Sequence, residues 1–250
     1  MYGVCVAIGI VFVVLYVWVL ERRMPALAGD LELCVACGGV GALIGAKMLY
    51  LLTVLPEFWA DLSSSSVWDA LTAYLSGGFV FYGGLYGGLL GALLYVKRSH
   101  LSTDTMLHLL LPIIPLFHSV GRIGCFCAGC CYGIPSAAFG ICYSESPFAP
   151  NHTPLFPIQP VESILLFLLF ALLLYLQKKR IGGWRMLGCY LLIYGTCRFL
   201  LEFLRGDAIR GILWGLSTSQ YISVPTALIG GILLIRNRKK AAGNGCDARR

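Results

Sequence analysis

Hydrophobic positions along this chain fall in long runs that are separated by short polar segments. Runs of about 20 apolar residues are typical of membrane-spanning helices, whereas strands would show an alternation of period two. In lipid, only helices and closed barrels satisfy the backbone hydrogen bonds. The pattern therefore predicts an all-α integral membrane protein, a bundle of about seven transmembrane helices. The runs lie at residues 2–20, 33–55, 76–96, 105–120, 161–177, 186–204 and 221–235.

Composition agrees with this prediction. Hydrophobic residues make up 58% of the 250 positions and charged residues only 12%, whereas a soluble domain carries about 25% charged residues. The net charge of +7 does not indicate a nucleic-acid partner, because the basic residues gather at the ends of the apolar runs rather than on a polar face.

The distribution of basic residues predicts the orientation of the bundle. An outside N-terminus with seven crossings places 14 of the 19 lysines and arginines on the inner side, as the positive-inside rule requires. The first run has no basic n-region and no small-residue cleavage site, so we expect a retained helix rather than a signal peptide. We predict one transmembrane domain over residues 1–240 and a disordered cytoplasmic tail over 241–250.

Glycines are concentrated in two of the runs, between Gly38 and Gly45 and between Gly83 and Gly91. Glycine at such positions permits close helix–helix approach in membranes. We expect these two runs to contain tightly packed helices.

Five basic residues do not belong to the inner clusters, and they lie within the runs or near their outer ends. Ionisable groups at membrane depth are costly and usually mark a functional site. We therefore regard them as candidates for function. They are Lys47, Arg122, Arg198, Arg205 and Arg210.

Arg122 stands in an unusual segment, between Gly121 and Gly124. A guanidinium group offers a planar fork of donors that matches phosphate oxygens. The flanking glycines would let the backbone approach a ligand closely. The segment predicts phosphate capture by Arg122; an interfacial anchor that extends to water is the alternative.

Arg198 and Glu202 are spaced i, i+4, so they share one face of the sixth predicted helix. Either they form a buried ion pair of structural use, or they line a polar cavity that Arg205 extends outward. His118 precedes Arg122 by four positions and would share its helix face. It is a candidate general base, with a structural role as the alternative.

Cysteines are numerous, 11 in all, and five of them fall between Cys125 and Cys142. The spacing C-x-C-x-x-C-C is compatible with disulfides or a metal site. Because no His-x-x-x-His and no second CxxC accompany it, we predict no metal ligand and no cofactor. A thiol-redox or metal-handling membrane protein that uses the cluster from Cys125 to Cys131 remains an alternative.

Several short motifs follow one another in a defined order over almost the whole chain: Tyr2-Gly3, Gly77-Gly78, Gly83-Gly84, Gly121-Arg122-Ile123-Gly124-x-Phe126, Gly129, Gly133, Pro157-Ile158-Gln159-Pro160-Val161-Glu162, Arg198-Phe199-x-x-Glu202-x-x-Arg205 and Ser217-x-x-Gln220-x-x-Ser223-x-Pro225. This order resembles that of bacterial prolipoprotein diacylglyceryl transferases. The resemblance implies seven spans with the N-terminus outside, in the bacterial cytoplasmic membrane, and an active site toward the outer face. It implies transfer of a diacylglyceryl group from phosphatidylglycerol to the lipobox cysteine in the signal peptide of a prolipoprotein, with glycerol phosphate leaving.

The resemblance also implies roles for single residues. Arg122 matches the essential arginine of the family, Arg198 a second arginine that stabilises the departing charge, and Glu202 would orient Arg198. The expected site residues on the phosphatidylglycerol side are Arg122, Tyr2, Gly124, Gly133 and Arg205.

This chain differs from the family pattern at three positions: Tyr82 replaces a histidine, Cys125 an asparagine and Cys130 a glutamate. We expect Tyr82 or His118 to act as the base. A catalytically divergent relative that still binds anionic phospholipid is the alternative.

Overall fold

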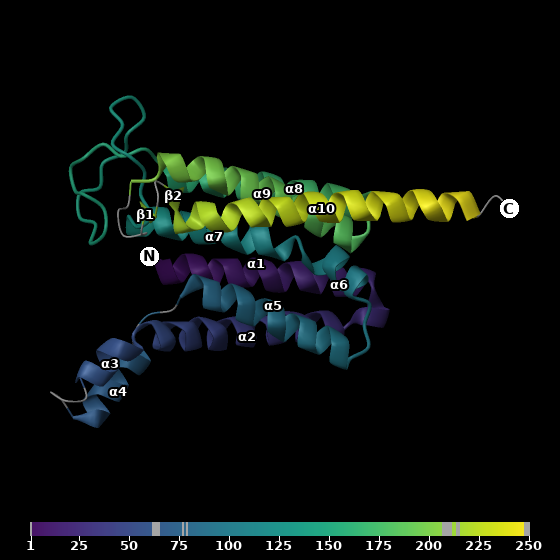
Figure 1. The fold of residues 1–250 in the computed structure, drawn as a ribbon, viewed down its shortest axis with the longest axis horizontal. Coiled ribbons are helices and arrows are strands. Elements are labelled where there is room, and N and C mark those ends of the chain that lie inside the picture. The colour runs from purple at the N-terminus through teal and green to yellow at the C-terminus, as the bar shows by residue number, and fades with distance from the viewer. Residues whose placement is uncertain are drawn as a thin grey trace. The chain divides into compact units, whose positions relative to one another are not determined.

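The computed structural model describes residues 2–61, 66–76, 78, 80–206, 212–213 and 216–247. The chain forms two compact units, one from Met1–Leu20 with Asp104–Arg250 and one from Glu21–Thr103. Figure 1 shows that helices dominate both units. The prediction of an all-α chain is therefore confirmed for the described residues, with one short two-stranded pairing as the addition.

The first unit holds most of the predicted site. Helix α7 packs against α8, α8 against α9, and α9 against α10, and Figure 1 shows the last two side by side. Strands β1 and β2 pair antiparallel before α10. The elements are α1 (Tyr2–Arg23), α6 (Thr103–Leu110), α7 (Ile113–Ala128), α8 (Ile158–Lys178), α9 (Gly183–Leu201), the 3-10 helix η2 (Glu202–Leu204), β1 (Ile212–Leu213), β2 (Leu216–Ser217) and α10 (Thr218–Asp247).

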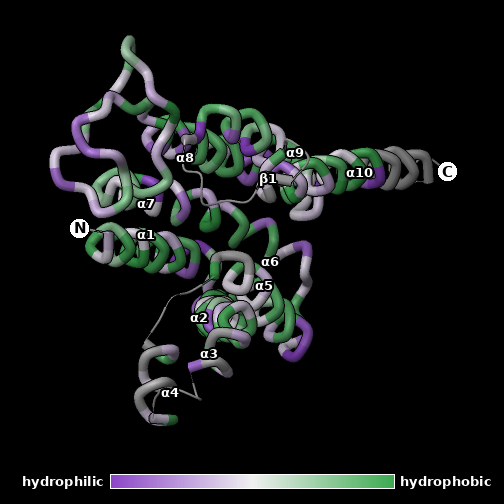
Figure 2. The backbone as a smooth tube through the Cα atoms, turned by 60° about the vertical axis from the view of Figure 1, so that its left-hand side comes forward, coloured by the Kyte–Doolittle hydropathy of each residue, from purple (hydrophilic) through white to green (hydrophobic). Residues whose placement is uncertain are grey.

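The core of this unit lies between the ends of α6, α8 and α9. Leu173 and Met186 are fully buried there, packed with Leu111, Leu169 and Tyr190. Figure 2 shows that hydrophobic residues predominate along α1 and α8. Many apolar side chains of these two helices are exposed on the surface of the protein. Such surfaces are compatible with a membrane, where lipid rather than water surrounds them.

The second unit consists of η1 (Pro25–Leu27), α2 (Asp30–Thr53), α3 (Leu55–Asp61), α4 (Val67–Ser76) and α5 (Phe81–Arg98). Its central feature is the packing of α2 against α5 through glycine. A Cβ atom at Gly87 would overlap the carbonyl oxygen of Gly41, and one at Gly45 would overlap that of Gly83. The expected close approach of the two glycine-rich helices is confirmed, since a larger residue at either site would separate the backbones.

Five described helices are long and apolar enough to cross a membrane: Tyr2–Arg23, Asp30–Thr53, Thr103–Ala128, Ile158–Lys178 and Gly183–Leu204. The other two predicted spans, 76–96 and 221–235, coincide with much of α5 and with part of α10. The third of the five combines α6 and α7, which are interrupted near Pro112 because proline cannot donate a helical hydrogen bond. The count of seven spans and the orientation stay predictions.

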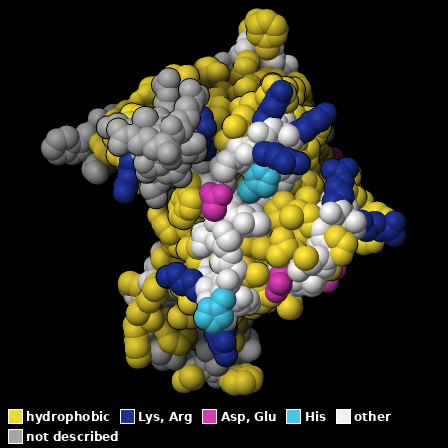
Figure 3. Space-filling model, turned by 90° about the vertical axis from the view of Figure 1, so that its right-hand side faces the viewer, with side chains coloured by type: hydrophobic (Ala, Val, Ile, Leu, Met, Phe, Trp, Pro, Cys, Tyr) yellow, Lys and Arg dark blue, Asp and Glu magenta, His cyan; other side chains and the backbone are white. Residues whose placement is uncertain are grey.

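Basic residues lie at the ends of several helices, as the charge pattern predicted. Lys178 stands in the last turn of α8, followed by Lys179 and Arg180 in the loop before α9. Figure 3 shows lysine and arginine side chains gathered on the face toward the viewer. Helix α10 is bounded at Asp247, beyond the predicted domain end at residue 240, and the division into a domain and a disordered tail stays a prediction.

Candidate functional site

Arg122 forms an ion pair that joins two helices. Its Nη2 atom, on α7, lies 2.9 Å from Oε1 of Glu162 on α8. The side chains are only 12% and 4% exposed, which does not fit the alternative of an anchor that extends to water. Nε of Arg122 has no hydrogen-bond partner among the described residues. Because a buried donor without an acceptor is costly, this edge of the guanidinium is suited to an external anion.

Arg198 forms the second buried pair, within its own helix and the turn that follows. Nη1 of Arg198 lies 2.7 Å from Oε2 of Glu202, with side chains 10% and 4% exposed. Nη2 of Arg198 also donates to the Ser219 hydroxyl of α10, at 3.2 Å. The expected i, i+4 pair is confirmed, and the contact with Ser219 holds the guanidinium between α9 and α10.

A pocket between α8 and α9 brings the two pairs to one place. Glu162 and Arg198 both line it, together with Tyr194 and Cys197. The rest of the lining is apolar, which strengthens electrostatic interactions inside it. One residue of each ion pair, Glu162 or Arg198, therefore lines the same cavity.

His118 lies near both arginines. Its ring meets the Tyr194 ring edge-on, with 5.8 Å between the centroids. Arg122 and Arg198 are both within electrostatic range of the imidazole. The structure thus places the candidate base beside the two candidate anion-binding residues, and its role as a base stays a prediction.

Gly124 makes room for helix α1 beside Arg122. A Cβ atom at Gly124 would lie 3.0 Å from Cβ of Cys5 and 3.1 Å from Cδ2 of Tyr2. Arg122 and Cys125 are electrostatic neighbours of the Tyr2 hydroxyl. Tyr2, predicted from the resemblance alone, therefore lies next to the arginine.

The segment after α7 carries the remaining predicted residues. Gly133 forms an isolated bridge with Arg205, and a Cβ at Gly133 would overlap the carbonyl oxygen of Phe156. A glycine is thus required where three segments meet. Arg205 is partly buried at this junction, so the structure brings together two of the five residues expected on the phosphatidylglycerol side.

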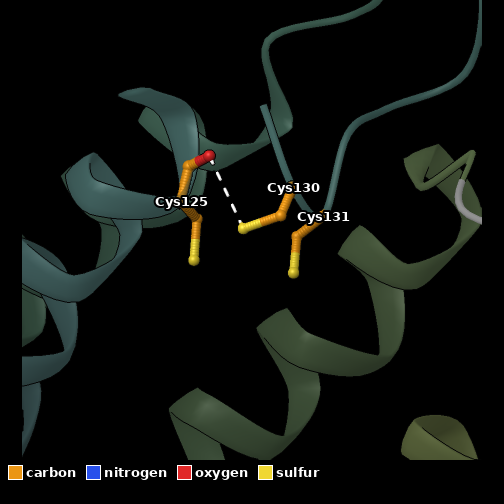
Figure 4. A group of neighbouring side chains, drawn as sticks. All are labelled: Cys125, Cys130 and Cys131. Carbon is orange, nitrogen blue, oxygen red and sulfur yellow. Dashed lines mark hydrogen bonds between the residues drawn. The ribbon is translucent and has the colours of Figure 1, made fainter. Parts of the chain in front are cut away.

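Three cysteines meet at the end of α7. The Sγ atoms of Cys125, Cys130 and Cys131 all lie within 4.8 Å of one another, and Figure 4 shows them on one side of the turn. We call these three residues the thiol cluster. Hydrogen bonds from the other two thiols lower the pKa of Cys131. The charges of Arg205 and Arg122 also lower this pKa, whereas burial raises it.

An apolar groove lies between α1, α7 and α8. Its volume is about 320 Å³, and its lining includes Phe12, Ile123 and Phe167. Among the described residues of its lining, only Ser119 and Ser163 have polar side chains, and the Ser163 hydroxyl donates to the Ser119 carbonyl oxygen, at 2.8 Å. Such a groove suits an acyl chain.

Sequence reasoning missed two residues of this site. Glu162 was noted only as part of a matching segment, although a lone carboxylate early in an apolar run was a signal. Gln159 is buried and donates from Nε2 to the carbonyl oxygen of Cys130, at 2.8 Å. The side chain of Tyr82 lies outside the described residues, so its role stays a prediction.

Comparisons with known proteins agree with the motifs. The family model described as prolipoprotein diacylglyceryl transferase matches residues 1–236. A phosphatidylglycerol–prolipoprotein diacylglyceryl transferase of Clostridium tetani is 36% identical over 236 residues, which cover 92% of this chain and 89% of the relative. A second, from Clostridium perfringens, is 35% identical over 80% of this chain and 75% of its own length. The chain belongs to the prolipoprotein diacylglyceryl transferase family.

Proposed function

We propose that this protein transfers the diacylglyceryl group of phosphatidylglycerol to the thiol of a lipobox cysteine in a prolipoprotein. The names of its relatives support this reaction. The observation that carries the proposal is the buried guanidinium of Arg122, held by Glu162 and with Nε unpartnered among the described residues. A fixed guanidinium with a free donor edge is what a lipid phosphate requires.

In this reaction the thiolate attacks the glyceryl carbon that carries the phosphate. A C–S bond forms and the C–O bond breaks, and its electron pair leaves with glycerol phosphate. The thiol proton passes to a base, His118 or Tyr82 in our proposal, and finally to solvent. Negative charge grows on the leaving phosphate, so cations already in place lower the barrier.

The residues divide into those that bind and those that position. Arg122 binds the phosphate and Arg198 stabilises the departing charge, while Glu162 and Glu202 hold the two guanidinium groups. Tyr2, Gly124, Gly133 and Arg205 shape the head-group side. The apolar groove beside Ile123 takes an acyl chain.

The proposed setting is the cytoplasmic membrane of a bacterium. We propose seven crossings with the N-terminus outside, which places the end of α7 and the segment from Gly129 to Pro157 at the outer face. The lipid then enters from the bilayer and the prolipoprotein from the outer side. The charge distribution supports this orientation.

The test uses the full chain in vesicles that contain phosphatidylglycerol with a labelled diacylglyceryl group. A peptide with a lipobox cysteine should gain the label and glycerol phosphate should be released. The same peptide with serine at that position, and vesicles of phosphatidylcholine alone, should give neither product. Binding of phosphatidylglycerol without transfer to the cysteine peptide would contradict the proposal and favour the divergent, non-catalytic relative.

A further inference from the structure

The thiol cluster is held by a defined backbone turn rather than by chance packing. Helix α7 ends with Gly129 in the left-handed region, at φ +73°. The Gly129 and Cys130 amides donate to the carbonyl oxygens of Phe126 and Cys125, both at 3.1 Å. These two bonds form a Schellman motif. The reversal carries Cys130 back toward Cys125, although five positions separate them.

Cys131 extends this reversal at a conformational cost. Its φ of +57° also lies in the left-handed region, which costs a non-glycine residue about 1–2 kcal/mol. Strain of this kind is concentrated at functional sites, where the surroundings hold it in place. In this conformation the Cys131 sulfur joins the other two, so the strained residue completes the cluster.

The dimensions of the cluster suit a thiolate-bound metal ion. A tetrahedral zinc ion with Zn–S bonds of about 2.3 Å places its sulfur ligands about 3.8 Å apart. The three Sγ atoms, all within 4.8 Å of one another, need only small side-chain shifts to reach that geometry. Cys127 and Cys142 are exposed and do not belong to this group.

The charges nearby favour the same occupant. Three thiolates with a divalent zinc ion carry a net charge of −1. Arg205 and Arg122 are both electrostatic neighbours of Cys131, and Gln159 fixes the backbone of the turn through the Cys130 carbonyl oxygen. Positive charge near the site offsets the net negative charge of the ligand set.

We propose that Cys125, Cys130 and Cys131 bind a zinc ion through three thiolates, and that its fourth position receives the thiol of the lipobox cysteine. Within the described part of the chain, the group contains three ligands and no fourth. Three protein ligands with one open position are the pattern of catalytic rather than structural zinc. The second half of this proposal rests on the proposed transfer function.

Coordination would supply the nucleophile that the reaction needs. A thiol bound to zinc would lose its proton more readily, to the proposed base and then to solvent, and would react as the thiolate. Cys125 lies three positions after Arg122, on the same face of α7, so the nucleophile would approach a phosphate held by Arg122. The sulfur would then form its bond to the glyceryl carbon as the C–O bond to the phosphate breaks and glycerol phosphate leaves, and the product thioether, a weaker ligand, would leave the metal. No oxidation or reduction occurs.

The first experiment measures metal binding without reference to activity. The full chain in detergent is reduced, stripped with a chelator and titrated with Co²⁺, which reports tetrahedral thiolate ligation by its absorption spectrum. We expect one Co²⁺ per chain with a thiolate-to-cobalt band. Cys125→Ser, Cys130→Ser and Cys131→Ser should each weaken binding at least tenfold, whereas Cys127→Ser should not. No such band, or equal affinity in all variants, would overturn the metal site.

The second experiment tests the open position and separates the two proposals. A lipobox peptide with cysteine should shift the Co²⁺ spectrum, and the serine peptide should not. An unchanged spectrum, or full transfer activity in the stripped protein, would overturn thiol activation by the metal. The latter result would leave the transferase function standing. The expected spectra without any transfer would leave the metal site standing and reject the transferase.

Discussion

Nη2 of Arg122 lies 2.9 Å from Oε1 of Glu162, and this contact joins α7 to α8 at the centre of the site. The two residues come from opposite sides of the long segment that contains the thiol cluster. The carboxylate neutralises the guanidinium inside the bundle and fixes its orientation. A lipid phosphate can then meet a cation that needs little rearrangement.

Glu162→Gln should therefore reduce transfer without removing any group that touches substrate. The variant leaves the buried charge of Arg122 uncompensated, which typically costs about 3–5 kcal/mol. We expect a lower unfolding temperature and a higher KM for phosphatidylglycerol, measured with labelled lipid. Glu145→Gln, at an exposed position, is the control and should behave as the wild type. Equal stability and kinetics in both variants would remove the positioning role of Glu162.

Two glycines on the same helix offer a matched test of the contact between α1 and α7. A Cβ at Gly124 meets Cys5 at 3.0 Å and Tyr2 at 3.1 Å, whereas one at Gly121 meets nothing within 4 Å. Gly124→Ala should destabilise the protein by about 1–3 kcal/mol through overpacking and lower the transfer rate severalfold. Gly121→Ala should leave the stability near wild type. A larger loss of stability in Gly121→Ala than in Gly124→Ala would contradict the placement of Tyr2 against Gly124.

The base can be assigned by comparing two single variants. If His118 accepts the proton, His118→Ala should lower kcat by about 10²-fold or more, with binding of phosphatidylglycerol retained and an altered pH profile. Tyr82→Phe should then keep most of the activity. An unchanged rate in well-folded His118→Ala rejects histidine as the base, and a selective loss in Tyr82→Phe assigns the role to the tyrosine.

The glycine contact between α2 and α5 predicts a stability effect in the second unit. Gly87→Ala should lower the unfolding temperature in detergent, because its Cβ would overlap the backbone of α2. Overpacking of this kind costs about 1–3 kcal/mol. Gly39→Ala is the control, since a Cβ there meets nothing within 4 Å. Equal unfolding temperatures for the two variants would show that α2 and α5 pack differently.

Local patterns predicted much of the fold and part of the site. The apolar runs identified the long helices, because their length and composition are local properties. The Arg198–Glu202 pair followed from i, i+4 spacing, which places both residues on one helix face. The proximity of Gly124 to Tyr2 had no such local signal and came only from family resemblance.

Contacts between distant segments could not be read in this way. The partner of Arg122 is Glu162, beyond a long irregular segment whose path depends on tertiary packing. The thiol cluster depends on left-handed backbone at Gly129 and Cys131. In the sequence, only Gly129 indicated such a conformation. Cysteine spacing alone argued against a metal, whereas the converging sulfur atoms support one.

The most direct test of the account is the transfer of labelled diacylglycerol from phosphatidylglycerol by variants at position 122. Arg122→Gln should lower kcat/KM roughly 10²-fold or more, as loss of a charge-stabilising donor does, and Arg122→Lys should restore only part of it. The double variant Arg122→Gln/Glu162→Gln replaces the ion pair with two neutral amides, so a folded protein can still be assayed. Its transfer should also be lost. Wild-type transfer and lipid binding in either glutamine variant would contradict the central claim that Arg122 holds the phosphate.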